Sequence, residues 1–338
     1  MRYATFRLPT PLGPRERVGV LTAAGTVLDL EGAYRQVLTE RIDPDRAAVV
    51  AAAVLPPDLL ALLGNGGLAT DAVAEVLEAF APVLDAPGAT TADGAVVVHA
   101  LGGLELLSPL PRPAGLRDCS AYEQHVATAS RGKVPERWYE MPAYYKGNPR
   151  TVVGTGADIP VPAGARKCDY ELEYAAVIGR RGADLTEEQA LACVAGYLVF
   201  NDVSIRDVQF REMSIGLGPA KSKDLDGTNV LGPVLVTPDE WDPHAPNVMR
   251  ALVNGEEWSR GLTDSIHHPV ERILSYISRG ETLHVGDVVG TGTVGGGCGL
   301  ELGRYPQPGD LVELEVEGLG RLSNRWCAAP GPAGQERG

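Results

Sequence analysis

The chain has 338 residues, 44% of them hydrophobic, which is enough to bury a substantial core. Its net charge of -14 argues against nucleic acid or a membrane surface as a partner, because both attract basic patches. The N-terminus lacks the apolar segment of a signal peptide, and no apolar run reaches transmembrane length. Five scattered cysteines without a CxxC motif are typical of reduced thiols. We therefore expect a cytoplasmic protein.

The first third of the chain alternates between strand and helix patterns. Strands are expected at 2–8, 18–22 and 27–30, followed by helices at 33–39, 44–54 and 70–84. No reactive side chains are concentrated here. We expect residues 1–105 to form a small N-terminal α/β domain.

Strand patterns dominate after the proline-spaced linker 107–113. Thr186 begins a capping-box pattern ahead of a short helix, and Asn254-Gly255 predicts a type I′ hairpin. Because few helices separate the strands, we expect an α+β protein whose larger domain, 106–326, is a mixed, mainly antiparallel β-roll or sandwich. Residues 327–338 are rich in Pro, Gly and Ala and are expected to form a flexible tail.

The stretch 168–179 is predicted to be a buried strand that carries acids. Side chains alternate along a strand, so Glu171 and Glu173 should point the same way, roughly 7 Å apart. Burying two carboxylates among apolar residues would cost several kcal/mol each unless a divalent cation joined them. Carboxylate oxygens suit Mg²⁺, Mn²⁺ or Ca²⁺ and do not suit zinc. The alternative is an edge strand whose acids lie in water.

Three further residues are candidates for the same site. Asp202 ends an apolar strand and would complete a three-carboxylate cation site, or it could cap the helix expected over 204–213. Asp118 is a candidate fourth ligand, or the acceptor of a local turn. His125 lies near Asp118 in sequence and is a candidate base, or an ordinary surface or core histidine.

Two other patterns do not predict a site of the usual kind. Gly290-Thr291-Gly292-Thr293-Val294-Gly295 matches GxGxxG, but no helical pattern follows, so we reject a dinucleotide fold. The glycines instead predict a loop that approaches a small ligand. The His267-His268 pair has no third ligand at a useful spacing, and we expect it to be solvated.

Taken together, these segments resemble the fumarylacetoacetate hydrolase family over about residues 105–325. The resemblance rests on Asp118…His125, Met141-Pro142…Tyr145, Glu171-Leu172-Glu173, Asn201 to Gln209, Lys221-Ser222-Lys223-Asp224, Leu231-Gly232-Pro233 and Gly290 to Thr293. It implies a β-roll catalytic domain, a Mg²⁺ or Ca²⁺ ion and a homodimer.

The resemblance also implies roles for individual residues. The metal ligands would be Glu171, Glu173 and Asp202, with Asp118 as a fourth in the branch nearest fumarylacetoacetase. The general base would be His125, with Lys221 and Gln209 as the polar groups over the substrate. Substrate contacts would come from Tyr145 and Thr293. Lys223 adds a positive charge that suits an anionic substrate, and Arg206 would brace the metal site or contact the substrate.

The chain departs from the family pattern at the partner of the base. Many smaller members place a glutamate three residues after the histidine, where this chain has Thr128, and Glu123, Glu136 and Glu140 are alternatives. The resemblance implies a hydrolase that cleaves a C–C bond of a 1,3-dicarbonyl or acylpyruvate-type 2-oxo acid through a metal enolate. Decarboxylase, tautomerase or hydratase chemistry at the same site, and a non-catalytic cation-binding protein, are the alternatives.

Overall fold

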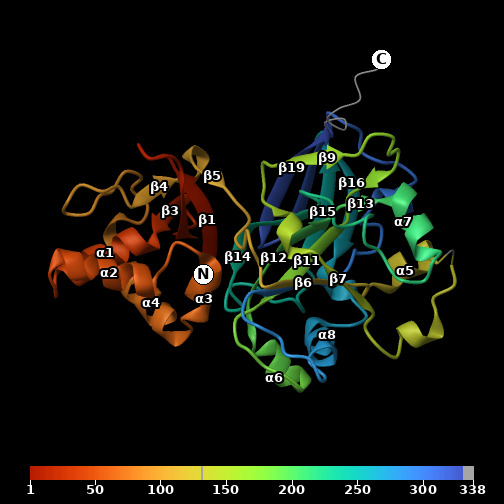
Figure 1. The fold of residues 1–338 in the computed structure, drawn as a ribbon, viewed down its shortest axis with the longest axis horizontal. Coiled ribbons are helices and arrows are strands. Elements are labelled where there is room, and N and C mark those ends of the chain that lie inside the picture. The colour runs from red at the N-terminus through yellow and green to blue at the C-terminus, as the bar shows by residue number, and fades with distance from the viewer. Residues whose placement is uncertain (131, 330–338) are drawn as a thin grey trace, which may run out of the picture.

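The computed structural model describes residues 1–130 and 132–329, and a 12-stranded, mainly antiparallel sheet runs through it (Figure 1). Its path is β4 (Val98–Ala100), β3 (Thr26–Asp29), β2 (Arg15–Leu21), β1 (Arg2–Leu8), β14 (Asn229–Val236), β12 (Val194–Asp202), β11 (Leu172–Ile178), β17 (Asp287–Gly290), β6 (Gly115–Cys119) and β7 (Tyr144–Gly147). Two short strands flank this path, β5 (Glu105–Leu106) on β1 and β8 (Val152–Val153) on β14.

A 5-stranded sheet packs against the larger one. Its order is β16 (Glu256–Leu262), β15 (Val248–Val253), β18 (Leu311–Val316), β19 (Gly320–Ala328) and β9 (Asp158–Val161). A third, small sheet pairs β10 (Cys168–Asp169) with β13 (Ser204–Ile205). The fold class expected from the sequence, α+β with mainly antiparallel sheets, is confirmed.

The helices divide between the two lobes seen in Figure 1. The N-terminal lobe has α1 (Leu30–Thr39), α2 (Pro44–Val54), α3 (Leu59–Gly64), α4 (Gly67–Phe80) and the 3₁₀ turns Ala81–Val83 and Leu101–Gly103. The larger lobe has α5 (Glu123–Ala129), α6 (Glu187–Leu191), α7 (Arg206–Met213), α8 (Val270–Ile277), α9 (Gly299–Leu302) and the 3₁₀ turns Glu136–Trp138, Pro149–Thr151 and Thr263–Ser265. In the described ranges, no helix is long and apolar enough to cross a membrane.

The two faces of the large sheet pack into two different cores. Along β11, Tyr174 and Ala176 join a core shared with the 5-stranded sheet, whereas Ala175 and Val177 join a core shared with α1 to α4. This alternation follows the two-residue period of a strand. Buried on both faces, β11 lies between β12 and β17, so the edge-strand alternative is wrong.

Most expected elements are present, with informative exceptions. The stretch 168–179 is divided into β10 and β11, and Glu171 lies between them in an isolated bridge to Cys298. The capping box at Thr186 is confirmed. The turn at Asn254-Gly255 is confirmed as well, and both of its residues have positive φ. Since β1 pairs with β14, the large sheet runs across the predicted boundary at 105/106, and that boundary stays a prediction.

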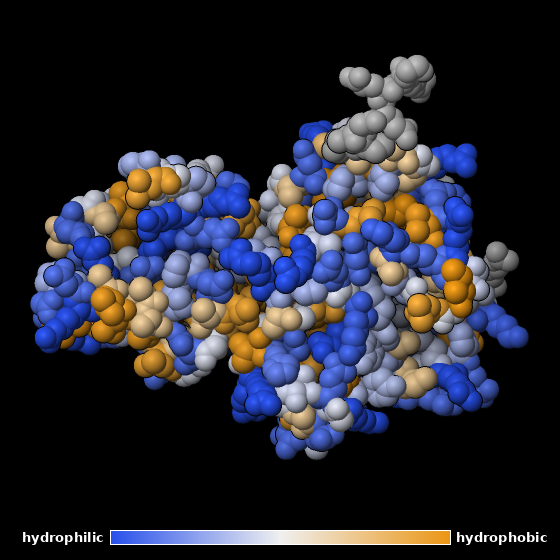
Figure 2. Space-filling model, viewed as in Figure 1, coloured by the Kyte–Doolittle hydropathy of each residue, from blue (hydrophilic) through white to orange (hydrophobic). Residues whose placement is uncertain are grey.

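The C-terminal tail was expected to begin at 327. Cys327 and Ala328 instead complete β19 and pair with β9, because the strand continues past the position where apolar alternation weakens. Residues 330–338 lie outside the described residues. The face shown in Figure 2 is mostly hydrophilic, with hydrophobic residues in small separate areas, which fits the acidic composition.

Candidate metal centre and base

Three carboxylates on strands β6, β11 and β12 of the large sheet meet near one end of these strands. Asp118 lies on β6, Glu173 on β11 and Asp202 at the end of β12, and one oxygen of each lies within 4.8 Å of the other two. Each acid extends a row of apolar residues facing the helix-covered core, because Leu116, Ala175 and Phe200 stand two positions away. Asp202 does not cap α7, whose N-cap is Ile205, and Asp118 lies in a strand rather than a turn.

Gly290 makes room for this meeting. It lies on β17, between the strands that carry Asp118 and Glu173. A Cβ atom at this position would lie 2.4 Å from Asp118 Oδ1 and 2.8 Å from the Phe200 ring. Any side chain here would therefore displace the Asp118 carboxylate.

Burial and mutual repulsion make these acids unusually basic. All three are at most 5% exposed. Burial, followed by the charge of Asp202, raises the pKa of Asp118 well above its ordinary value, and burial followed by Asp118 does the same for Glu173. Burial raises the pKa of Asp202 to about 6. Among the described residues, Asp118 Oδ1 and Asp202 Oδ1 have no hydrogen-bond partner. A small hard cation would fit this donor set and remove both penalties.

Glu171 is held differently from the other three. Its Oε1 accepts a hydrogen bond from Arg206 Nη2 at 2.6 Å, and its Oε2 accepts one from Lys223 Nζ, which also contacts Asp202. Burial alone would raise the pKa of Glu171, but the charges of Arg206 and Lys223 outweigh it and lower that pKa. Glu171 is therefore an anion already matched by cations, and its role as a metal ligand stays a prediction.

Neighbouring groups hold the carboxylates in place. Glu173 accepts hydrogen bonds from Gly292 N at 3.0 Å and Thr293 Oγ1 at 3.1 Å, and Asp202 accepts one from the Tyr145 hydroxyl at 2.8 Å. Thr293 and Tyr145 were predicted to contact the substrate. In the structure they contact two acids of the proposed cation site, Glu173 and Asp202. The glycine-rich loop approaches an acid through its backbone rather than cradling a dinucleotide.

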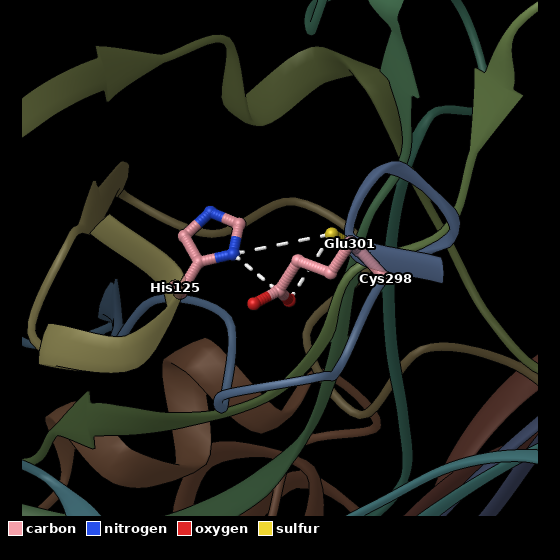
Figure 3. A group of neighbouring side chains, drawn as sticks. All are labelled: His125, Cys298 and Glu301. Atoms are coloured by element: carbon pink, nitrogen blue, oxygen red, sulfur yellow. Dashed lines mark hydrogen bonds and ion pairs between the residues drawn. The ribbon is translucent and has the colours of Figure 1, made fainter. Parts of the chain in front are cut away.

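His125 lies beside this cluster and pairs with a carboxylate that sequence reasoning missed. Its Nδ1 is 3.2 Å from Glu301 Oε2, and Cys298 Sγ is 3.4 Å from the same oxygen (Figure 3). Burial alone would raise the pKa of Glu301, but its hydrogen bond to His125 lowers it. An ionised carboxylate can only accept, so Nδ1 carries the proton and Nε2 is free to take one. Nε2 is 3.9 Å from Glu171 Oε1, too far for a hydrogen bond.

Two of the predicted catalytic residues lie away from the acids. Lys221 is exposed, and its backbone N–H donates to Glu212 Oε1 at 2.7 Å. Gln209 accepts a hydrogen bond from Arg206 Nη1 at 2.8 Å, which connects it to the site through that arginine. Their catalytic roles stay predictions. Arg206 itself is buried and joins Asp169, at 2.8 Å, to Glu171, as expected for a bracing residue.

The His267-His268 pair was expected to be solvated, and this is wrong for His268. His268 is fully buried, and its Nε2 lies 2.6 Å from the Trp138 carbonyl oxygen. The residue packs beneath the 3₁₀ turn Glu136–Trp138, a long-range contact that spacing along the chain cannot reveal.

The residues missed from the sequence were Glu301, Cys298 and Asp169. Alternation could have indicated Asp169, since Asp169, Glu171 and Glu173 stand at every second position. Asp169 accepts hydrogen bonds from Gly299 N and Leu300 N as well as from Arg206, and so anchors α9. For Glu301 the only signal was its place just after the glycine-rich loop.

The fold and the site together define an enzyme, and comparison with known proteins identifies the family. Residues 116–326 match the family described as fumarylacetoacetate (FAA) hydrolase C-terminal. The chain therefore belongs to the fumarylacetoacetate hydrolase family.

Individual relatives and structural neighbours are named for different activities. The oxaloacetate tautomerase YisK of Bacillus subtilis is 30% identical over 233 residues, which cover 68% of this chain and 75% of that protein. The fumarylacetoacetate hydrolase of Exiguobacterium antarcticum is 28% identical with a TM-score of 0.67, over 96% of this chain and 99% of that chain. The maleylpyruvate hydrolase of Sphingobium sp. SYK-6, solved with manganese(II) and pyruvate, shares the fold with a TM-score of 0.68 at 19% identity, over 98% of this chain and 100% of that chain.

Proposed function

We propose that this enzyme is a divalent-cation-dependent hydrolase that cleaves a C–C bond in a small anionic 2-oxo acid of the acylpyruvate type. The observation that carries the proposal is the His125–Glu301 pair, whose free Nε2 faces Glu171 beside a buried three-carboxylate cluster. Hydrolysis needs both a group that accepts a proton from water and a centre that stabilises negative charge on the substrate.

The cation would be held by Asp118, Glu173 and Asp202, with Glu171 close enough to join if Lys223 moved. Two buried carboxylate oxygens that have no partner within residues 1–130 and 132–329, and three mutually repelling acids, are the features that support this. Oxygen donors favour Mg²⁺ or Mn²⁺. When bound, the cation supplies a Lewis acid that polarises the oxygens of a chelating substrate.

The chain's own residues would orient water and substrate. Glu301 fixes the imidazole so that Nε2 accepts the proton of a water held between His125 and the substrate. Burial alone would lower the pKa of Lys223, but the charges of Asp202 and Glu171 outweigh it and raise that pKa, so its ammonium stays charged. This ammonium, which pairs with Glu171 and Asp202, would offer a positive charge to the carboxylate of an anionic substrate.

Oxaloacetate tautomerisation is the second candidate, favoured by the Bacillus subtilis relative. A tautomerase also uses a base, but the base removes a proton from carbon instead of water. The two reactions therefore differ in whether His125 activates a water molecule.

Product analysis separates the two. Acetylpyruvate, fumarylpyruvate and oxaloacetate would be supplied with Mg²⁺, with EDTA as the metal-free control. Cleavage into two carboxylic acids that disappears in His125→Ala supports the hydrolase. Enol–keto interconversion of oxaloacetate without cleavage of any acylpyruvate would overturn it in favour of the tautomerase. A homodimer is proposed from the family resemblance, and light scattering would test it.

A further inference from the structure

Cys298 is placed beside the proposed base pair in a way that hydrolysis does not require. Cys298 precedes α9, Glu301 lies within α9, and His125 comes from α5, so segments far apart in sequence bring an imidazole, a thiol and a carboxylate together (Figure 3). Cys298 Sγ lies 3.9 Å from His125 Nδ1 and 3.4 Å from Glu301 Oε2. With the 3.2 Å separation of Nδ1 and Oε2, the three atoms form a triangle whose edges run from 3.2 to 3.9 Å.

We propose that His125, Cys298 and Glu301 form a second metal site, selective for Zn²⁺ and similar borderline-soft cations. Ligand bonds of 2.0–2.3 Å at tetrahedral angles place zinc ligand atoms about 3.3–3.6 Å apart, and the triangle's edges match this to within a few tenths of an ångström. The fourth position would be left for water or a substrate oxygen. The acidic cluster of Asp118, Glu173 and Asp202, by contrast, offers only the oxygen donors that hard cations prefer.

The third residue of the triangle has spare coordination capacity. Glu301 has a 5% exposed side chain, and its Oε1 has no hydrogen-bond partner in the described ranges. Burial raises the pKa of the Cys298 thiol well above its ordinary value, so the thiol is protonated and inert without metal. A bound Zn²⁺ deprotonates a coordinating thiol outright, which makes the metal rather than pH the trigger.

Occupancy of this site should inhibit the enzyme, a consequence that rests on the proposed role of His125. Zinc on Nδ1 leaves the ring proton on Nε2, the nitrogen that must accept a proton from water. Zinc also removes Glu301 as the partner of the imidazole. Mg²⁺ in the acidic cluster would not compete, because the two sites share no ligand.

The test is a Co²⁺ titration of the full chain in saturating Mg²⁺, followed by absorption. Co²⁺ reports a thiolate ligand through a near-ultraviolet charge-transfer band and tetrahedral geometry through visible bands. We expect the bands to saturate at one Co²⁺ per chain and to be removed by Zn²⁺. In Cys298→Ser the charge-transfer band should vanish and Zn²⁺ affinity should fall about a hundredfold or more. The matched control is Cys193→Ser, another buried free cysteine, which should keep the band.

Absence of the band in the wild type, or its persistence in Cys298→Ser, would overturn the site. These readouts need no substrate, so they stand whatever reaction the enzyme performs. Inhibition is then measured against each variant's own zinc-free rate: Zn²⁺ should stop the wild type and spare Cys298→Ser. Zinc occupancy without inhibition would overturn the inhibitory role, while the activity of His125→Ala decides separately whether His125 is the base.

Discussion

Replacing Glu301 with glutamine tests the base pair most sharply. The change keeps the size of the side chain but removes a charge 3.2 Å from His125 Nδ1. Both side chains are largely buried, 13% and 5% exposed, so an effective dielectric constant of about 20 applies, and a full imidazolium would lose about 5 kcal/mol of attraction. If the proton is about half transferred in the transition state, the barrier rises by about 2.5 kcal/mol, and kcat should fall about a hundredfold.

The assay is steady-state turnover of the best substrate of the panel at saturating Mg²⁺. KM should change little, because Glu301 acts through His125 rather than on the substrate. Glu123→Gln is the matched control: Glu123 lies in the same helix as His125 but bonds the exposed Tyr139 hydroxyl, at 2.6 Å, and should retain full activity. A Glu301→Gln enzyme within threefold of the wild type would refute the reasoning.

Three further predictions concern the acidic cluster. Lys223→Met leaves the buried Asp202 without a cationic partner and Glu171 with Arg206 alone, so the metal-free protein should lose about 3–5 kcal/mol of unfolding free energy. Mg²⁺ should restore part of this loss, and an unchanged denaturation midpoint would contradict the prediction. Gly290→Ala should displace the Asp118 carboxylate and weaken Mg²⁺ binding, as measured by calorimetry. The control is Gly102→Ala, where the added Cβ meets no atom and Mg²⁺ affinity should not change. Equal affinities of the two variants would show that the close approach of Gly290 to Asp118 is unimportant. Because burial raises the pKa of Asp202 to about 6, above its unfolded value, metal-free stability should fall as pH rises from about 4 through 6. Since the pKa values of Asp118 and Glu173 are raised as well, apparent Mg²⁺ affinity should fall at least tenfold per pH unit below 6, and a pH-independent affinity would exclude proton displacement.

Local patterns predicted the elements and much of the acidic cluster. Alternation along β11 indicated that Glu173 shares a face with apolar residues. The apolar run before Asp202 indicated that Asp202 lies at the end of a strand. Both signals depend on neighbours in sequence, which period-two geometry relates directly. Asp118 was a candidate ligand from the sequence, but its closeness to the other two acids depends on the order of β6, β17 and β11 in the sheet, which local patterns do not give.

The rest could not be predicted because it depends on packing between distant segments. Glu301 is 176 residues from His125, and no spacing rule connects them. As lysines, Lys221 and Lys223 could equally supply a positive charge to the site. Only the path of the loop places Lys223 among the buried acids and leaves Lys221 exposed. The division of 168–179 at Glu171 likewise follows from a bridge to Cys298, not from local propensity.

The central claim is that Asp118, Glu173 and Asp202 hold a divalent cation. The most direct measurement is anomalous scattering from crystals grown with Mn²⁺. We predict a strong anomalous peak in contact with oxygens of all three residues, which disappears in Asp202→Asn. An absent peak, or one that contacts none of these carboxylates, would contradict the account.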